Sequence, residues 1–154
     1  MSLSDSFSYG AKLESVQRQF KAGLVIKLFC DFITDHKWKR LVIVAARRER
    51  PLFFLINTEP TPYAKRTPRL SSQQLQMLKA SETFLDHDSW VDCSNAFDDF
   101  ELAEIEHTLA SNMRLILGVI SKEAAAGIIE RIADSETLEQ RHINEISMEL
   151  SELL

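Results

Sequence analysis

The feature that most constrains the fold is a pair of apolar segments separated by a short charged turn. Residues 40–46 read Arg-Leu-Val-Ile-Val-Ala-Ala, and residues 52–57 read Leu-Phe-Phe-Leu-Ile-Asn. Nearly continuous apolar runs rich in β-branched and aromatic residues are typical of strands that are buried on both faces. Residues 47–51, Arg-Arg-Glu-Arg-Pro, form a turn of hairpin length between them. We therefore expect a central antiparallel hairpin around which the rest of the chain folds.

Shorter strand signals flank this hairpin. Apolar residues occupy every second position from Leu24 to Phe32, while Lys27 and Asp31 lie between them, which predicts a half-buried strand over residues 24–33. Residues 75–80 and 89–93 predict two more strands. Proline at positions 60, 62 and 68 excludes regular pairing after the hairpin, so we expect a loop of about a dozen residues there.

Helical patterns dominate both ends of the chain. An amphipathic helix is expected within the first 22 residues, and weaker helical spacing occurs over residues 100–109. Ser121 is a typical N-cap for a helix that continues to Ile132. A last helix, from about residue 135, carries a narrow apolar seam of four residues: Ile143, Ile146, Leu150 and Leu153.

These elements predict an α+β fold with a small curled antiparallel sheet or barrel. The sequence lacks the alternation of strands and helices that is typical of a parallel sheet. A chain of 154 residues is long enough to bury a substantial core in one domain. We expect a barrel domain with its closing helix over residues 23–133. Helical extensions are expected over residues 1–22 and 134–154.

The composition fits a soluble protein of the cytoplasm that uses no cofactor. The chain is 45% hydrophobic and 27% charged, and charged residues interrupt every apolar stretch before it reaches membrane-spanning length. The N-terminal residues lack the basic and apolar regions of a signal peptide. Cys30 and Cys93 fall in strand-like segments, so we expect two buried thiols in a reducing compartment.

Half of the positive charge is concentrated in one fifth of the chain. Residues 37–69 contain nine basic and two acidic side chains, a local charge of +7 in a protein whose net charge is −5. Residues 81–154 carry a local charge of −13. Since phosphate groups respond to local potential, the acidic total does not exclude a nucleic-acid partner. The nine basic residues are Lys37, Lys39, Arg40, Arg47, Arg48, Arg50, Lys65, Arg66 and Arg69.

Six short segments resemble the PemK/MazF toxin family. Their sequences are Gly-Leu-Val-Ile-Lys-Leu-Phe (23–29), Phe-Ile-Thr-Asp (32–35), Lys-Arg-Leu-Val-Ile-Val (39–44), Ile-Asn-Thr (56–58), Asp-Ser-Trp-Val-Asp-Cys (88–93) and Gly-Val-Ile-Ser (118–121). The resemblance covers about residues 23 to 133. Leu24 and Leu41 stand where the family has Asp and Pro.

The resemblance implies an SH3-like barrel, commonly dimeric. It also implies a metal-independent endoribonuclease that a protein antitoxin neutralises. The family's functional arginine and hydroxyl residue correspond to Arg40 and Thr58. Arginine suits the stabilisation of charge on phosphorus, and a threonine hydroxyl donates hydrogen bonds to phosphate or orients the arginine.

Several candidate residues remain open to a simpler interpretation. Arg40 lies at a strand start and Thr58 just beyond the hairpin partner of that strand, so the two are expected to be neighbours. In the simpler interpretation, Arg40 is a solvated charge at a strand end and Thr58 is a turn residue. His36 is an accessory acid/base candidate, because imidazole exchanges protons near neutrality, or else an exposed loop residue. The other eight basic residues are candidate RNA- or anion-binding groups. They alternatively form a solvated face, bind an acidic protein segment, or pair with the chain's own acidic half.

Asp86, His87, Asp88 and Asp92 form the densest group of potential metal ligands. Consecutive side chains of an extended segment point to opposite sides, so they do not converge on one ion, and we expect no metal site.

Two functions are therefore carried forward. The first is a PemK/MazF-like endoribonuclease or RNA-binding relative that acts through Arg40 and Thr58. The second is a non-catalytic module that self-associates or binds a protein partner through its terminal helices, because a narrow apolar seam such as that of residues 143–153 commonly packs against a partner helix.

Overall fold

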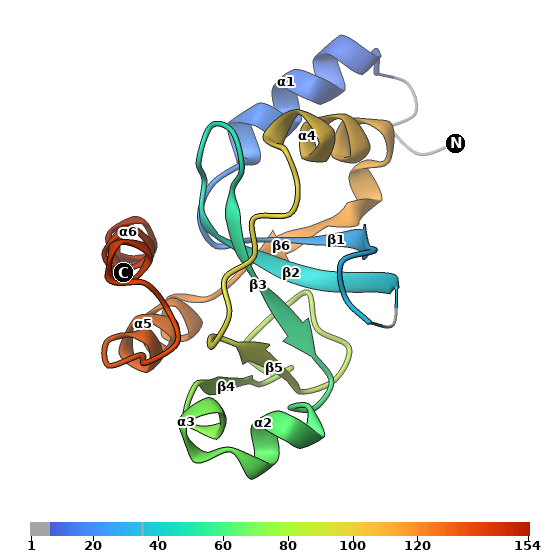
Figure 1. Ribbon diagram of the computed structural model, residues 1–154. Coiled ribbons are helices and arrows are strands. Elements are labelled where there is room, and N and C mark those ends of the chain that lie inside the picture. The colour runs from blue at the N-terminus through green and yellow to red at the C-terminus, as the bar shows by residue number, and fades with distance from the viewer. Residues whose placement is uncertain (1–6, 35) are drawn as a thin grey trace.

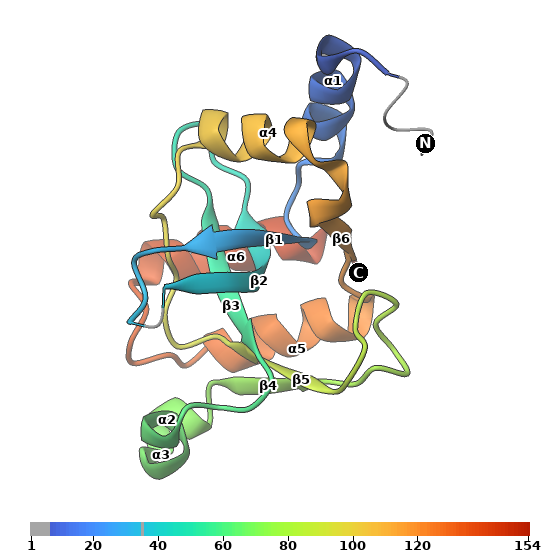
Figure 2. The same ribbon diagram turned by 90° about the vertical axis from the view of Figure 1, so that its right-hand side faces the viewer.

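The computed structural model describes residues 7–34 and 36–154, which fold as an α+β protein around one antiparallel sheet. The sheet has six strands in the order β4-β5-β3-β2-β1-β6 and curls into a half-barrel (Figures 1 and 2). The strands are β1 Leu24–Cys30, β2 Lys37–Ala45, β3 Leu52–Asn57, β4 Gln74–Met77, β5 Ser89–Asp92 and β6 Ile116–Val119. The helices are α1 Tyr9–Gln19, α2 Pro62–Arg66, α3 Pro68–Ser71, α4 Leu102–Ser111, α5 Lys122–Ile132 and α6 Gln140–Ser151, with a 3₁₀ turn, η2, at Met113–Leu115.

The predicted central hairpin is confirmed as β2 and β3. Arg40 pairs with Ile56 at one end, Ala45 pairs with Leu52 at the other, and a bulge interrupts the register between Ile43 and Ala45. The side chains of residues 41–45 and 52–54 are at most 1% exposed. Burial on both faces explains why this segment lacks the polar alternation of a half-exposed strand.

Two hydrophobic clusters cover the opposite faces of the sheet. One face packs against α1 and α4 through Val16, Ile105 and Leu109. The other face packs against α5 and α6. Figure 1 shows the two helix pairs on different sides of the strands. Alternate residues of β2 are divided between the clusters, as the two-residue period of a strand requires.

The predicted N-cap of the closing helix, Ser121, is present. The Ser121 hydroxyl accepts a hydrogen bond from the Ala124 amide at 3.1 Å, which satisfies one of the free N–H groups at the start of α5. Glu82, only 3% exposed, accepts hydrogen bonds from the Ser121 amide and hydroxyl at 2.8 and 2.6 Å. This buried carboxylate therefore ties the loop before β5 to the helix start.

The structure differs from the sequence-based expectation at three places. Residues 116–119, for which no strand was predicted, form edge strand β6 against β1. The proline-containing loop holds α2 and α3, each beginning on a proline, because the missing N–H costs nothing at the first helical position. Strand β1 ends at Cys30 instead of at Ile33, and β2 begins at Lys37 instead of at Arg40, so the connection between them lies three residues earlier than expected.

The apolar seam of α6 lies inside the chain's own core. Ile143, Ile146 and Leu150 are at most 5% exposed, and Leu153 packs against the same cluster. Two polar contacts join this helix to the central hairpin. Arg47 donates to both carboxylate oxygens of Glu145 at 2.7 to 3.2 Å, and the Ala46 amide donates to Glu149 at 2.8 Å. The seam that suggested a partner helix is thus covered within the protomer.

No helix in the described part of the chain is both long enough and apolar enough to cross a bilayer.

Candidate active site

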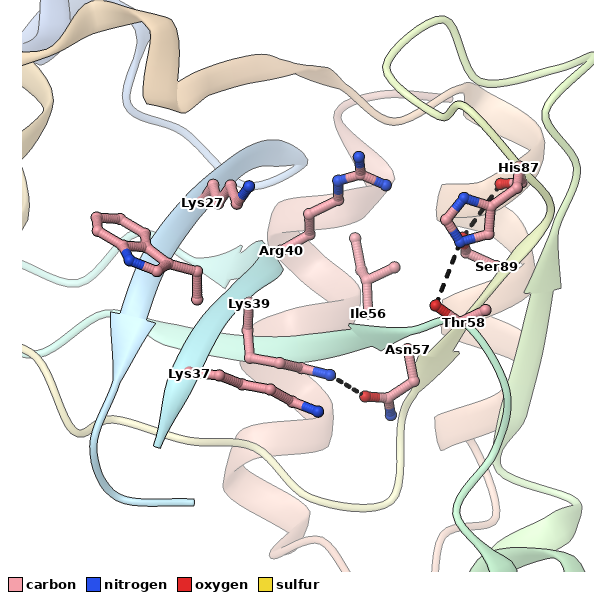
Figure 3. Close-up of a pocket in the computed structure, with 10 residues that line it drawn as sticks. Lys27, Lys37, Lys39, Arg40, Ile56, Asn57, Thr58, His87 and Ser89 are labelled. Carbon is pink, nitrogen blue, oxygen red and sulfur yellow. Dashed lines mark hydrogen bonds between the residues drawn. The ribbon is translucent and has the colours of Figure 1, made fainter. Parts of the chain in front are cut away.

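A pocket opens where β2 and β3 part. Arg40 and Ile56 are the last pair between these strands; residues 37–39 of β2 pair with β1, while Asn57 pairs with Trp90 of β5. The Lys39 ammonium donates to the Asn57 side-chain oxygen across the gap (Figure 3). The pocket has a volume of about 310 Å³. Its lining residues are Lys27, Lys37, Trp38, Lys39, Arg40, Ile56, Asn57, Thr58, His87 and Ser89.

A chain of hydrogen bonds connects four side chains at this pocket. The Thr58 hydroxyl lies 3.2 Å from His87 Nε2, and His87 Nδ1 lies 2.7 Å from Asp86 Oδ1. Asp86 also accepts two parallel hydrogen bonds from the Arg40 guanidinium, at 3.2 and 3.4 Å. Figure 3 shows Thr58 and His87 joined at the pocket, with the Arg40 head close by. The two elements concerned are the hairpin and the loop that precedes β5.

The positions of the hydrogens in these hydrogen bonds follow from the protonation state of Asp86. Hydrogen bonds from Arg40 and from His87 lower the pKa of Asp86 to about 2, so the carboxylate is ionised and only accepts. His87 Nδ1 therefore carries the hydrogen that it donates to Asp86. In the neutral imidazole, Nε2 then carries the lone pair and accepts a hydrogen bond from the Thr58 hydroxyl. This nitrogen faces Thr58 and the pocket.

Arg40 and Thr58, the two residues predicted to act together, line the same pocket. Arg40 pairs with Ile56 and not with Thr58, so the hairpin register is displaced by two residues from a symmetrical arrangement about the turn. Because paired residues of adjacent strands share a face, Ile56 lies on the face that Arg40 occupies, and Thr58 follows two residues later, just beyond the end of β3. Arg40 and Thr58 therefore line one pocket, as neighbours would, although the register differs from the symmetrical arrangement.

His36, the predicted accessory acid/base, does not line this pocket. It is exposed and adopts a positive φ of 39° in the β1–β2 connection. His87 takes the position beside Thr58 instead, which the sequence reasoning missed because the Asp86-His87-Asp88 run was considered as a metal site or as the end of a loop, and not as part of this pocket. The available signal was an Asp-His pair placed directly before a strand.

The basic stretch does not form one surface. Lys37, Lys39 and Arg40 line the pocket, whereas Arg47 and Arg50 lie at the turn, beyond the Ala45 end of the hairpin, which is five residues or about 17 Å from Arg40. Arg47 binds Glu145, and Arg50 donates to the Asp98 carbonyl and lies 3.5 Å from Glu101. These two arginines thus pair with the chain's own acidic half, one of the interpretations left open above.

The remaining basic residues are exposed. Lys65 on α2 forms an ion pair with Glu59 at 3.0 Å, and Arg66 and Arg69 lie exposed on α2 and α3. Arg48 is exposed at the hairpin turn.

A second hollow of about 590 Å³ adjoins the pocket and shares four of its residues: Lys37, Lys39, Asn57 and Thr58. A third, of about 460 Å³, shares Glu59 and Pro60 with the second and is lined by Lys65 and Trp90. The three hollows thus lie around the open end of the hairpin and the start of α2, and neighbouring hollows share lining residues.

The acidic residues near the site have separate partners. Asp88 accepts from the Lys79 amide and Asp92 from the Gln74 side chain, while Asp86 binds Arg40. Within residues 7–34 and 36–154, no three or more His, Cys, Asp or Glu side chains are placed to hold one metal ion.

The two cysteines lie away from this chemistry. Both are fully buried, and burial raises the pKa of Cys30 to about 11 and that of Cys93 further. Their thiols stay protonated near neutral pH, so these residues are packing groups and not nucleophiles.

Comparisons with family models, with curated proteins and with solved structures found no match to this chain.

Proposed function

We propose that this protein is a PemK/MazF-like endoribonuclease that cleaves RNA at the pocket between β2 and β3 without a metal ion. The observation that carries the proposal is the hydrogen-bonded chain Thr58–His87–Asp86–Arg40 at a pocket lined by lysines. It combines a proton acceptor, a permanent cation and a hydroxyl at one site. The proton acceptor and the cation meet two requirements of attack by a ribose 2′-hydroxyl, removal of its proton and stabilisation of charge on phosphorus.

The reaction follows from these groups. His87 Nε2 removes the proton of the 2′-hydroxyl as the 2′-oxygen attacks phosphorus. The bond between phosphorus and the 5′-oxygen breaks, and the leaving oxygen takes a proton from solvent in the open pocket. The products are a 2′,3′-cyclic phosphate and a 5′-hydroxyl. Asp86 holds His87 in the correct tautomer and stabilises the imidazolium that forms, as a carboxylate does for histidine in hydrolase triads.

Arg40 stabilises the charge that develops on the phosphoryl oxygens. Its guanidinium is planar and always ionised, and its side chain is 25% exposed, so one edge remains available to a phosphate while the other holds Asp86. The Lys37 and Lys39 ammonium groups add positive potential at the same place. The Thr58 hydroxyl, which donates to His87 in the free protein, turns to a phosphate oxygen when the substrate hydroxyl takes its place.

The test is cleavage of a long RNA by purified protein in EDTA, with three variants. His87→Ala is expected to lower the cleavage rate by about 10²–10⁴-fold, the usual contribution of general base catalysis. Thr58→Ala should lose less, because the threonine positions groups and forms no covalent bond. Arg69→Ala, which removes an exposed charge on α3, should cleave at the wild-type rate. Loss of all activity in Thr58→Ala together with a covalent adduct on the wild-type threonine would instead identify Thr58 as a nucleophile.

The proposal extends to the features that the family resemblance implies. These are closure of the sheet as an SH3-like barrel, a homodimer in the cytoplasm, and neutralisation by a protein antitoxin. Light scattering of the purified protein measures its oligomeric state. The alternative function is a non-catalytic module that binds a partner through its terminal helices. It was suggested by the apolar seam of α6, and that seam is buried within the protomer.

A further inference from the structure

Two aromatic side chains stand exposed beside the pocket. Phe29 of β1 and Trp38 of β2 lie opposite each other in the strand register, with ring centroids 6.0 Å apart in an edge-to-face arrangement. Phe29 is 47% and Trp38 is 51% exposed, and Trp38 lines the pocket. The next pair on the same face is Lys27 and Arg40. A platform of two rings therefore adjoins two cations.

On this face of the sheet, β1 and β2 are exposed only at the end that carries the two rings. Further along the same face, Val25 and Val42 form a pair that is completely buried under α5 and α6. The sheet extends beyond the helices that cover it, and in its last two residue pairs on this face Lys27, Phe29 and Trp38 are exposed and Arg40 is partly exposed. Exposed aromatic rings that adjoin cations are the combination with which proteins bind single-stranded nucleic acids, through stacking on bases and attraction to phosphates.

We propose that the Phe29–Trp38 platform stacks a base of single-stranded RNA next to the phosphate held by Arg40. This inference rests on the proposed function for its substrate class. Trp38 and Arg40 are two residues apart on one strand, about 6.7 Å, so base and phosphate contacts are neighbours on one face. Bases inside a duplex are stacked on each other and offer no free face, so the platform selects single strands.

The test separates stacking from charge and from cleavage. The probe is a short 2′-O-methyl RNA of mixed sequence, which lacks the attacking hydroxyl, and the control probe is an abasic oligomer with the same number of phosphates. Trp38→Ala should weaken binding of the first probe by about 5- to 100-fold and leave binding of the abasic oligomer unchanged. Trp38→Phe should keep most of the affinity, since any aromatic ring offers a stacking face.

A direct readout is available because the chain has only two tryptophans, Trp38 and Trp90. In a Trp90→Phe background the emission comes from Trp38, and the 2′-O-methyl RNA should quench it while the abasic oligomer should not. A melting curve shows whether each variant is folded.

Equal weakening of both probes by Trp38→Ala, or no weakening of either, would overturn the inference. Selective binding of the base-containing probe by a protein that cleaves no RNA would refute the proposed cleavage and leave the platform intact. Cleavage that is unaffected by Trp38→Ala, with no quenching, would refute the platform and leave the cleavage intact.

Discussion

Replacement of Ile146 by alanine tests whether α6 belongs to the core of this protein. Ile146 is fully buried in the cluster that joins α5, α6 and one face of the sheet. The change removes the equivalent of three methylene groups, about 2.4 kcal/mol at about 0.8 kcal/mol each. Incomplete closure of the resulting cavity raises the cost, so we expect a loss of about 3 kcal/mol in the free energy of unfolding.

For a domain of about 150 residues, this loss corresponds to a fall in melting temperature of about 6–12 °C. The assay is urea unfolding and thermal melting of the purified protein, followed by circular dichroism. Met148→Ala is the matched control on the same helix, because Met148 is 70% exposed, and it should change stability by no more than about 0.5 kcal/mol. If Ile146→Ala were as mild as this control, the helix would not be part of the core, and the seam would again be available to a partner.

Three further predictions concern the turn before β1, the α6 contact and the site. Gly23→Ala should lower the free energy of unfolding by about 1–3 kcal/mol in urea titrations, because Gly23 has φ +97° and an added Cβ would lie 2.6 Å from Leu153 Cδ1. Burial raises the pKa of Glu149, so its contribution to stability is complete below its unfolded pKa and is lost as pH rises through the folded value. Glu149→Gln should therefore gain stability relative to wild type between pH 4 and pH 7, and an unchanged difference would contradict this. Arg40→Ala should raise the pKa of Asp86 from about 2 toward 3.8 in an NMR titration of the carboxyl group; a pKa that stays near 2 would show that Arg40 does not hold it.

The parts of the fold that the sequence predicts are those with local causes. The central hairpin follows from two apolar runs and a five-residue turn, and the start of α5 follows from its Ser121 cap. Strand β6 is missed although residues 115–120 form an apolar run, because the strand is only four residues long, contains Gly118 and pairs with β1, which lies at least 90 residues away.

The same distinction explains the site. Arg40 and Thr58 belong to one hairpin, so their proximity is predictable from the chain on either side of the turn. His87 joins them only because β5 pairs with the end of β3, an arrangement set by tertiary structure. The seam of α6 was open to either interpretation, since an apolar stripe has the same spacing whether it covers its own sheet or a partner helix.

The most direct test of the central claim compares RNA cleavage by wild type, Arg40→Ala and Arg48→Ala in EDTA. Both variants remove one positive charge, but Arg40 lies in the pocket and Arg48 is exposed at the far end of the hairpin. We predict 2′,3′-cyclic phosphate ends from wild type and Arg48→Ala at similar rates, and a rate at least about 100-fold lower from Arg40→Ala. No cleavage by the wild type, or equal cleavage by all three proteins, would contradict the assignment of this pocket as a ribonuclease site.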